Sequence, residues 1–145
     1  MGLKKATIID GKEFSSRTNQ SLLPNVKLIV EKIGRPPALA VILVGEDTAS
    51  HVYVRNKVKQ TKDAGMVSIE HQLSAETSEK TLLSLIDTLN KDDQIDGILV
   101  QLPLPKHINE NSVIHTINPE KDVDGFHVIN AGKLATGQKG LVPCT

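Results

Sequence analysis

Residues 38–45 read Ala38-Leu-Ala-Val-Ile-Leu-Val-Gly45, an apolar run of strand length that ends in glycine. A run of this kind is typical of a parallel strand that is covered on both faces. A segment with helical character follows, Ser50-His-Val-Tyr53-Val-Arg-Asn-Lys57. Residues three and four apart share one face of a helix, so Ser50, Tyr53 and Lys57 are predicted to project together. Open α/β sheets bind ligands at the carboxyl ends of their strands. A phenol and an amine at that place could stack on a ring and move protons.

The same alternation of short apolar strands and helices continues on both sides of this segment. Strands are predicted over residues 39–44, 67–73 and 95–101, and helices over 12–33, 48–64, about 77–89 and about 110–116. Strands that alternate with helices imply βαβ units and a parallel sheet. The predicted fold class is therefore α/β, a three-layer αβα arrangement with a mostly parallel sheet.

Several residues predict where these elements break. Pro24 interrupts the first helical pattern, so a kink or a late helix start is expected there, and Gly65 is suited to end the second helix. Leu102-Pro-Leu-Pro105 cannot continue a central strand, because proline lacks the N–H. The charged stretch 119–127 is predicted to be an ordered loop, and the glycines within 132–140 predict irregular backbone.

Composition excludes several classes of partner. The 145 residues suffice for one domain, and 17 basic and 17 acidic residues cancel, which disfavours DNA or an anionic membrane as a partner. Aromatic residues make up 2%, too few for a surface that stacks on bases. No run approaches the roughly 20 apolar residues that span a bilayer, and the start lacks a signal-peptide core. The single cysteine, Cys144, excludes an internal disulfide and fits a reducing compartment. A cytoplasmic location is expected.

The pair Tyr53 and Lys57 has more than one interpretation. Alone, it fits a surface lysine and a half-buried tyrosine on an amphipathic helix. The spacing also occurs in short-chain dehydrogenases, but these require a glycine-rich dinucleotide loop, and no G-x-G-x-x-G occurs in this sequence. That family is therefore discounted.

Gln101 ends a predicted buried strand within Asp96-Gly-Ile-Leu-Val-Gln-Leu-Pro-Leu-Pro105. A buried amide must find hydrogen-bond partners. Gln101 could bond the backbone of the following loop, or it could point into the same cleft as Lys57.

The loop Pro119-Glu-Lys-Asp-Val-Asp-Gly-Phe-His127 contains residues that could suggest a metal site, namely Asp122, Asp124 and His127. A calcium loop needs more oxygen ligands at regular spacing, and a zinc site needs further His or Cys. Metal binding is therefore disfavoured. A carboxylate in this loop is better suited to accept paired hydrogen bonds from the edge of a ring.

Together, the three segments resemble the bifunctional methylenetetrahydrofolate dehydrogenase/cyclohydrolase family, in its amino-terminal catalytic domain. The resemblance covers essentially the whole chain, and its longest strings are 96–105 and 121–127. The other residues that carry it are Leu43-Val-Gly45, Ala49-Ser50, Tyr53-Val54, Lys57, Gly65, His107-Ile108, Pro119, Asn130, Gly132, Leu134 and Pro143-Cys-Thr145.

The resemblance implies that the parent enzyme oxidises 5,10-methylenetetrahydrofolate with NADP and hydrolyses the methenyl product to 10-formyltetrahydrofolate. It implies that Lys57 works in proton transfer and water activation, that Tyr53 stacks on the folate ring and that Gln101 hydrogen-bonds the lysine. Asp124 is implied to hold the pterin's amino and ring nitrogens. The implied catalytic residues are Lys57, Tyr53 and Gln101, and the implied substrate-binding residues are Ser50, Tyr53, Val100, Gln101, Leu102, Pro103 and Asp124.

The resemblance also implies what this chain lacks. In the family, a Rossmann-type domain that binds NADP follows the position of Thr145. Residues 1–145 are thus expected to be the folate-binding catalytic domain alone, with no cofactor or metal site and with weak or no activity in isolation. A domain that binds folate without catalysis, or one whose site has decayed, are the alternatives. The parent is expected to be a homodimer that acts on tetrahydrofolate derivatives.

Overall fold

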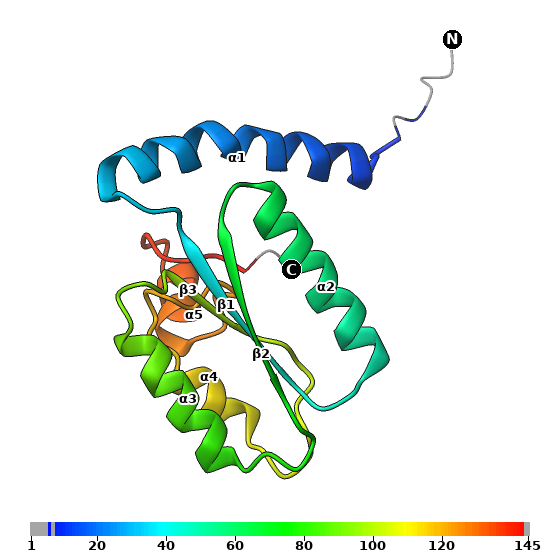
Figure 1. The fold of residues 1–145 in the computed structure, drawn as a ribbon, viewed down its shortest axis with the longest axis vertical. Coiled ribbons are helices and arrows are strands. Elements are labelled where there is room, and N and C mark those ends of the chain that lie inside the picture. Colours follow the sequence, from blue (N-terminus) through cyan, green and yellow to red (C-terminus); the bar gives the residue numbers. More distant parts are fainter. Residues whose placement is uncertain (1–5, 7, 144–145) are drawn as a thin grey trace.

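The structure is a computed structural model that describes residue 6 and residues 8–143; Cys144 and Thr145 lie outside the described residues. Helices and strands alternate along the chain as far as α4, and a further helix, α5, follows (Figure 1). In order they are α1 (Gly11–Ile33), β1 (Ala38–Val44), α2 (Thr48–Asp63), β2 (Val67–Leu73), α3 (Glu79–Lys91), β3 (Gly97–Val100), α4 (Glu110–Thr116) and α5 (Val128–Ala135). No helix among these residues is long and apolar enough to cross a membrane.

The three strands form a parallel sheet in the order β2-β1-β3. Val41 in the central strand is opposite Glu70 of β2 and Leu99 of β3. The central position explains why residues 38–44 form a continuous apolar run, since neighbours cover both edges and helices cover both faces. The predicted parallel sheet is confirmed.

Alternate side chains of β1 serve opposite faces of the sheet, as the pleat requires. One face packs against α3 and α4, with the buried cluster Ala40, Ile42, Val44, Leu82, Ile86, Ile98, Val100 and Val113 among its members. The other face packs against α2, through Val41, Leu43, Val54, Val58 and Leu99. Figure 1 shows α2 on one side of the sheet and α3 with α4 on the other. The three-layer αβα prediction is therefore confirmed.

Local capping fixes where α2 and α3 begin. The Asp47 carboxylate accepts a hydrogen bond from the Ser50 N–H at 3.3 Å, and the Ser78 hydroxyl accepts from the Thr81 N–H at 3.2 Å. Such side chains satisfy N–H groups that the first helical turn leaves free. α2 ends at Asp63, and Gly65 follows with a φ of +81°, in the left-handed region that glycine adopts without a steric penalty.

The predicted late start of the first helix is wrong. α1 runs without interruption from Gly11 to Ile33 with Pro24 inside it, and Figure 1 draws it as one helix. Proline removes the bond to the carbonyl four residues earlier, that of Gln20. Gln20 and Pro24 are both exposed, so water can satisfy that carbonyl. Only Val26 of α1 is buried. The helix therefore tolerates the missing hydrogen bond to the Gln20 carbonyl on its solvent-exposed side.

The predicted irregular backbone over residues 132–140 is wrong for its first part, because α5 occupies Val128–Ala135, whereas residues 136–140 form neither helix nor strand. His127 caps it, with Nδ1 accepting from the Ile129 N–H at 3.1 Å. Asn130 is 1% exposed and holds the helix to the preceding loop. A glycine inside a helix costs about 1 kcal/mol relative to alanine, and this tertiary contact outweighs the cost of Gly132.

Asp96, the first residue of the 96–105 string, joins the chain before β1 to the start of β3. Arg35 donates to both carboxylate oxygens of Asp96, at 2.7 and 3.1 Å, and the Ala38 N–H donates at 2.8 Å. The hydrogen bond from Arg35 is the main cause that lowers the pKa of Asp96. This residue therefore has a structural task at the end of the sheet that is opposite to the cleft described below.

The lowered pKa of Asp96 predicts a pH-dependent loss of stability. A carboxyl whose pKa is depressed by folding stabilises the fold above its unfolded pKa of about 4, and this contribution is lost as the pH falls through the folded pKa. We expect Asp96→Asn to lower the melting temperature at pH 7 and to approach the wild type near pH 3. Thermal denaturation across this range measures the effect, with the exposed Asp87→Asn on α3 as control. An equal difference at both pH values would contradict the assignment.

Candidate functional site

A cleft of about 300 Å³ opens where the carboxyl end of β3 faces α2. Three segments far apart in the sequence contribute its walls: the middle of α2, the end of β3, and the loop that precedes α5. The residues that line it are Tyr53, Lys57, Val100, Gln101, Leu102, Asp124 and Phe126. The location agrees with the rule that open α/β sheets bind ligands beyond the carboxyl ends of their strands.

Lys57 and Gln101 form a direct contact inside this cleft. The Lys57 ammonium donates to Gln101 Oε1 at 3.3 Å, and Gln101 Nε2 donates to the Leu102 carbonyl at 2.6 Å. The second bond fixes the amide with its oxygen towards the amine. Both alternatives for Gln101 are thus realised together, since it bonds the loop backbone and also points into the cleft.

Asp124 lies across the cleft from this pair, in the loop before α5. The side chain is half-buried, and among the described residues its carboxylate accepts no hydrogen bond. Burial raises the pKa of Asp124, the nearby Asp122 acts in the same direction, and Lys57 opposes both. A carboxylate held against apolar walls without a partner is suited to a ligand that brings its own hydrogen-bond donors.

The other charged residues of the 121–127 string serve the backbone. Lys121 donates to the carbonyls of Leu89 and Asp92, at 3.0 and 2.8 Å, where α3 ends. Asp122 is 2% exposed and accepts from the His127 N–H at 2.9 Å. Within residues 6 and 8–143, no three metal-ligating side chains come together. The carboxylate that faces the cleft from this string is that of Asp124.

Two residues of the predicted site lie apart from the cleft walls. Ser50 is 3% exposed, in the first turn of α2, and it does not line the cleft. Pro103 is exposed and does not line it either.

Tyr53, in contrast, lines the cleft and is 62% exposed, so it lies at the mouth of the cleft. The functional roles of these residues stay predictions.

Phe126 lines the cleft and is absent from the predicted site. The residue is 43% exposed, although a loop rich in charge gives little reason for an aromatic side chain. One of two phenylalanines in a chain with 2% aromatic residues, placed two positions after Asp124, was the available signal.

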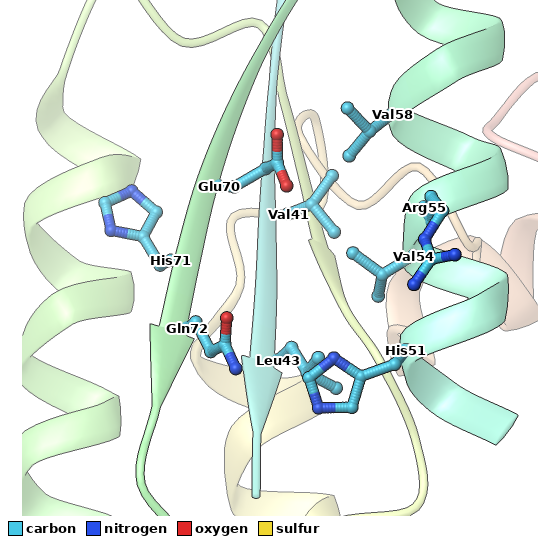
Figure 2. Close-up of a pocket in the computed structure, with 9 residues that line it drawn as sticks. All are labelled: Val41, Leu43, His51, Val54, Arg55, Val58, Glu70, His71 and Gln72. Atoms are coloured by element: carbon cyan, nitrogen blue, oxygen red, sulfur yellow. The ribbon is translucent and has the colours of Figure 1, made fainter. Parts of the chain in front are cut away.

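A second cavity, of about 350 Å³, lies on the other side of α2, towards β2 (Figure 2). Its floor is apolar, and His51 and Arg55 reach over it from α2. These two residues are on the opposite side of the helix from Tyr53 and Lys57, as their spacing requires. Figure 2 shows His71 on the far side of β2, consistent with the pleat. The lining residues are Val41, Leu43, His51, Val54, Arg55, Val58, Glu70, His71 and Gln72. The two cavities share none of these residues.

The fold and the cleft define a class of protein, the α/β domains that hold a small ligand beyond the carboxyl edge of a parallel sheet. The sequence profile described as tetrahydrofolate dehydrogenase/cyclohydrolase, catalytic domain, matches residues 9–124. The chain belongs to this family, and the predicted resemblance is confirmed.

Relatives of known name agree with this assignment. Bifunctional protein FolD 2 of Roseobacter denitrificans is 58% identical over 140 residues, which are 97% of this chain and 47% of the relative. Bifunctional protein FolD 3 of Rhizorhabdus wittichii is 57% identical over 145 residues, 100% of this chain and 48% of the relative. The chain therefore spans about half the length of the curated relatives it matches.

Solved structures have the same fold. A 5,10-methylenetetrahydrofolate dehydrogenase from the silkworm Bombyx mori superposes with a TM-score of 0.93 at 43% identity, over 96% of this chain and 48% of the silkworm chain. The methylenetetrahydrofolate dehydrogenase-cyclohydrolase of Trypanosoma brucei, solved with NADP and an inhibitor, gives 0.91 at 32% identity, over 98% and 49%.

Proposed function

We propose that this domain binds a reduced folate in the cleft between α2 and the end of β3. We propose further that the longer protein interconverts 5,10-methylene-, 5,10-methenyl- and 10-formyltetrahydrofolate, in one-carbon metabolism. The observation that carries the proposal is the contact of Lys57 with Gln101, opposite Asp124, whose carboxylate accepts no hydrogen bond from the residues that the structure describes. Family membership supplies the substrate class.

Each side chain has a task in this proposal. Asp124 accepts hydrogen bonds from the donor edge of the pterin, because an ionised carboxylate offers two oxygens to paired donors. Tyr53, exposed at the mouth, stacks on the ring, and Phe126 with Leu102 forms apolar wall. The amine of Lys57 lies near the one-carbon bridge, and Gln101 fixes its direction.

The hydrolysis step uses this arrangement. Water adds to the bridging carbon of the methenyl group, the bond from that carbon to N5 breaks, and the formyl group stays on N10. The water loses its protons, N5 gains one, and one proton is released overall. Lys57 is positioned to pass these protons, a task for which a general acid–base side chain typically contributes about 10²- to 10⁴-fold in rate.

Oxidation of the methylene group requires NADP, which accepts the hydride. The T. brucei relative was solved with this cofactor. The 145 residues contain no G-x-G-x-x-G loop to hold its pyrophosphate. Because the residues present do not fit the cofactor, the hydride transfer is not assigned to residues of this chain. We assign NADP binding to the part of the longer relatives that this chain does not cover.

The finer features of the parent protein are proposed on the same basis. The parent protein is a homodimer in the cytoplasm, without nucleic acid or membrane partners. Its formyl product serves purine biosynthesis. A domain that binds folate without catalysis is the second candidate, because the high exposure of Tyr53 shows that the cleft is open to water.

The test uses the chain of 145 residues without NADP. Loss of methenyl absorbance follows hydrolysis of 5,10-methenyltetrahydrofolate, and isothermal titration with 5-formyltetrahydrofolate measures binding. A rate above that of buffer, together with binding, is expected if the cleft is complete for hydrolysis. Binding at the buffer rate would leave a folate-binding domain whose cleft needs the remainder of the longer protein. The absence of both binding and hydrolysis would overturn the proposal.

A further inference from the structure

We infer that Asn130 is the positioning residue that holds Asp124 in place, and that recognition of the pterin amino group depends on it. This inference rests on the proposed function, since it concerns how the same cleft obtains its specificity. Asn130 does not line the cleft, so it acts through the loop and does not touch the ligand.

The Asp124 side chain is not held by a hydrogen bond of its own among the described residues. Its carboxylate accepts no hydrogen bond there, and it lies in a loop outside the regular strands. The direction in which it points is therefore set by the backbone on either side. A flexible loop would present this carboxylate in many orientations, and binding would have to order it at the expense of affinity.

Asn130 ties that backbone at two points. Its Nδ2 group donates to the Pro119 carbonyl at 2.8 Å and to Asp122 Oδ2 at 3.0 Å. An amide carries two N–H donors, so these bonds use both of them. Pro119 lies at the start of the loop, and Asp122 lies two residues before Asp124. One buried side chain thus fixes the loop at its start and in its middle.

The same network fixes the loop on the far side of Asp124. Asp122 Oδ2, which accepts from Asn130, also accepts from the His127 N–H at 2.9 Å. This bond closes residues 122–127, the segment that contains Asp124, into a hydrogen-bonded loop. Asp122 is further held to the sheet, because the Ile98 N–H of β3 donates to the Lys121 carbonyl at 2.7 Å.

Burial makes this arrangement sensitive to small changes. Asn130 and Asp122 are 1% and 2% exposed, so water cannot replace a lost bond without rearrangement. Truncation of Asn130 would free the Pro119 carbonyl and leave Asp122 Oδ2 with one donor. The loop would then relax, and the carboxylate of Asp124 would lose its direction even though its own residue is unchanged.

The test compares two ligands that differ in one group, 5,8-dideazafolic acid and its 2-desamino counterpart. Wild-type chain is expected to prefer the amino compound by about tenfold or more, the contribution of a hydrogen bond to a charged group. Asn130→Ala is expected to reduce this preference below about threefold, while the desamino compound binds as it does to wild type. Asn130→Ser, which keeps one donor, serves if the alanine variant does not fold.

A control separates positioning from general instability. Leu82→Ala opens a cavity in the core on α3, where Leu82 is fully buried and remote from the loop. It is expected to lower the melting temperature and to keep the full preference for the amino compound. A folded Asn130 variant that keeps the full preference would overturn this inference alone. Failure of the wild type to bind either compound would overturn the proposed function as well.

Discussion

Lys57→Ala is expected to reduce hydrolysis of 5,10-methenyltetrahydrofolate by about 100-fold or more, the typical contribution of a general acid–base side chain. The contact of Lys57 with Gln101 places this amine in the cleft, opposite Asp124. Loss of the methenyl absorbance measures the rate. Binding of 5-formyltetrahydrofolate, measured by titration, should change far less, because Asp124 and the ring walls remain.

Two matched variants sharpen this result. Lys59, two residues along the same helix, is exposed and paired with Asp63 at 2.7 Å, so Lys59→Ala should leave the rate unchanged. Lys57→Arg keeps a positive charge but cannot give up its proton under assay conditions. We expect it to be nearly as inactive as Lys57→Ala. Full activity in the arginine variant would mean that charge alone suffices, and that proton transfer has been assigned to the wrong group.

Asp124→Asn is expected to weaken folate binding by about 1.5–3 kcal/mol, the value of a hydrogen bond to a charged group. This corresponds to roughly a 10- to 150-fold higher dissociation constant. Burial raises the pKa of Asp124, so the proton competes with the ligand at a pH above the usual value of about 4. Wild-type affinity should therefore fall as the pH drops towards that range, and the asparagine variant should lack this decline. Titration calorimetry from about pH 4, near the ordinary carboxyl pKa, to about pH 8 measures both effects.

The same substitution should stabilise the fold at neutral pH. A group whose pKa is raised by folding stabilises below its unfolded pKa, and this contribution is lost as the pH rises through the folded pKa. Asn cannot ionise, so Asp124→Asn should have the higher melting temperature at pH 7, by an amount that shrinks as the pH approaches 4. Glu120→Gln, an exposed carboxylate of the same loop, should show neither effect. A less stable Asp124→Asn at pH 7 would show that the carboxylate is held by favourable contacts.

Much of the fold follows from local sequence. The apolar run at 38–44 predicts a central parallel strand because only such a strand is covered on both faces. The helix after it follows from the spacing of Ser50, Tyr53 and Lys57. The late helix start at Pro24 and the irregular backbone at Gly132 were wrong predictions, because local rules assign a cost to a proline or a glycine without regard to its surroundings. The exposed side of α1 and the buried amide of Asn130 change those costs, and neither is visible in a local pattern.

The candidate site divides in the same way. Tyr53 and Lys57 are predicted together by helical spacing, and the end of a buried strand marks Gln101. That Asp124 is the acidic side chain of its loop that faces the cleft, whereas Asp122 turns to the backbone, depends on the course of the loop. Phe126 belongs to the same cleft for the same reason. Sequence identifies the loop, and only the tertiary structure separates its binding residues from its scaffold.

The two edges of the sheet differ in what they offer to other chains. On the β3 side, the Lys121 carbonyl already accepts the Ile98 N–H, so the loop that carries Asp124 occupies part of this edge. On the other side, β2 is the last strand of the sheet in the described part of the chain, and its residues are exposed or half-buried. Growth of the sheet by a foreign strand is therefore directed to β2, where the charge of Glu70 opposes it. Pairing at that edge would leave the cleft at the end of β3, two strands away, unobstructed.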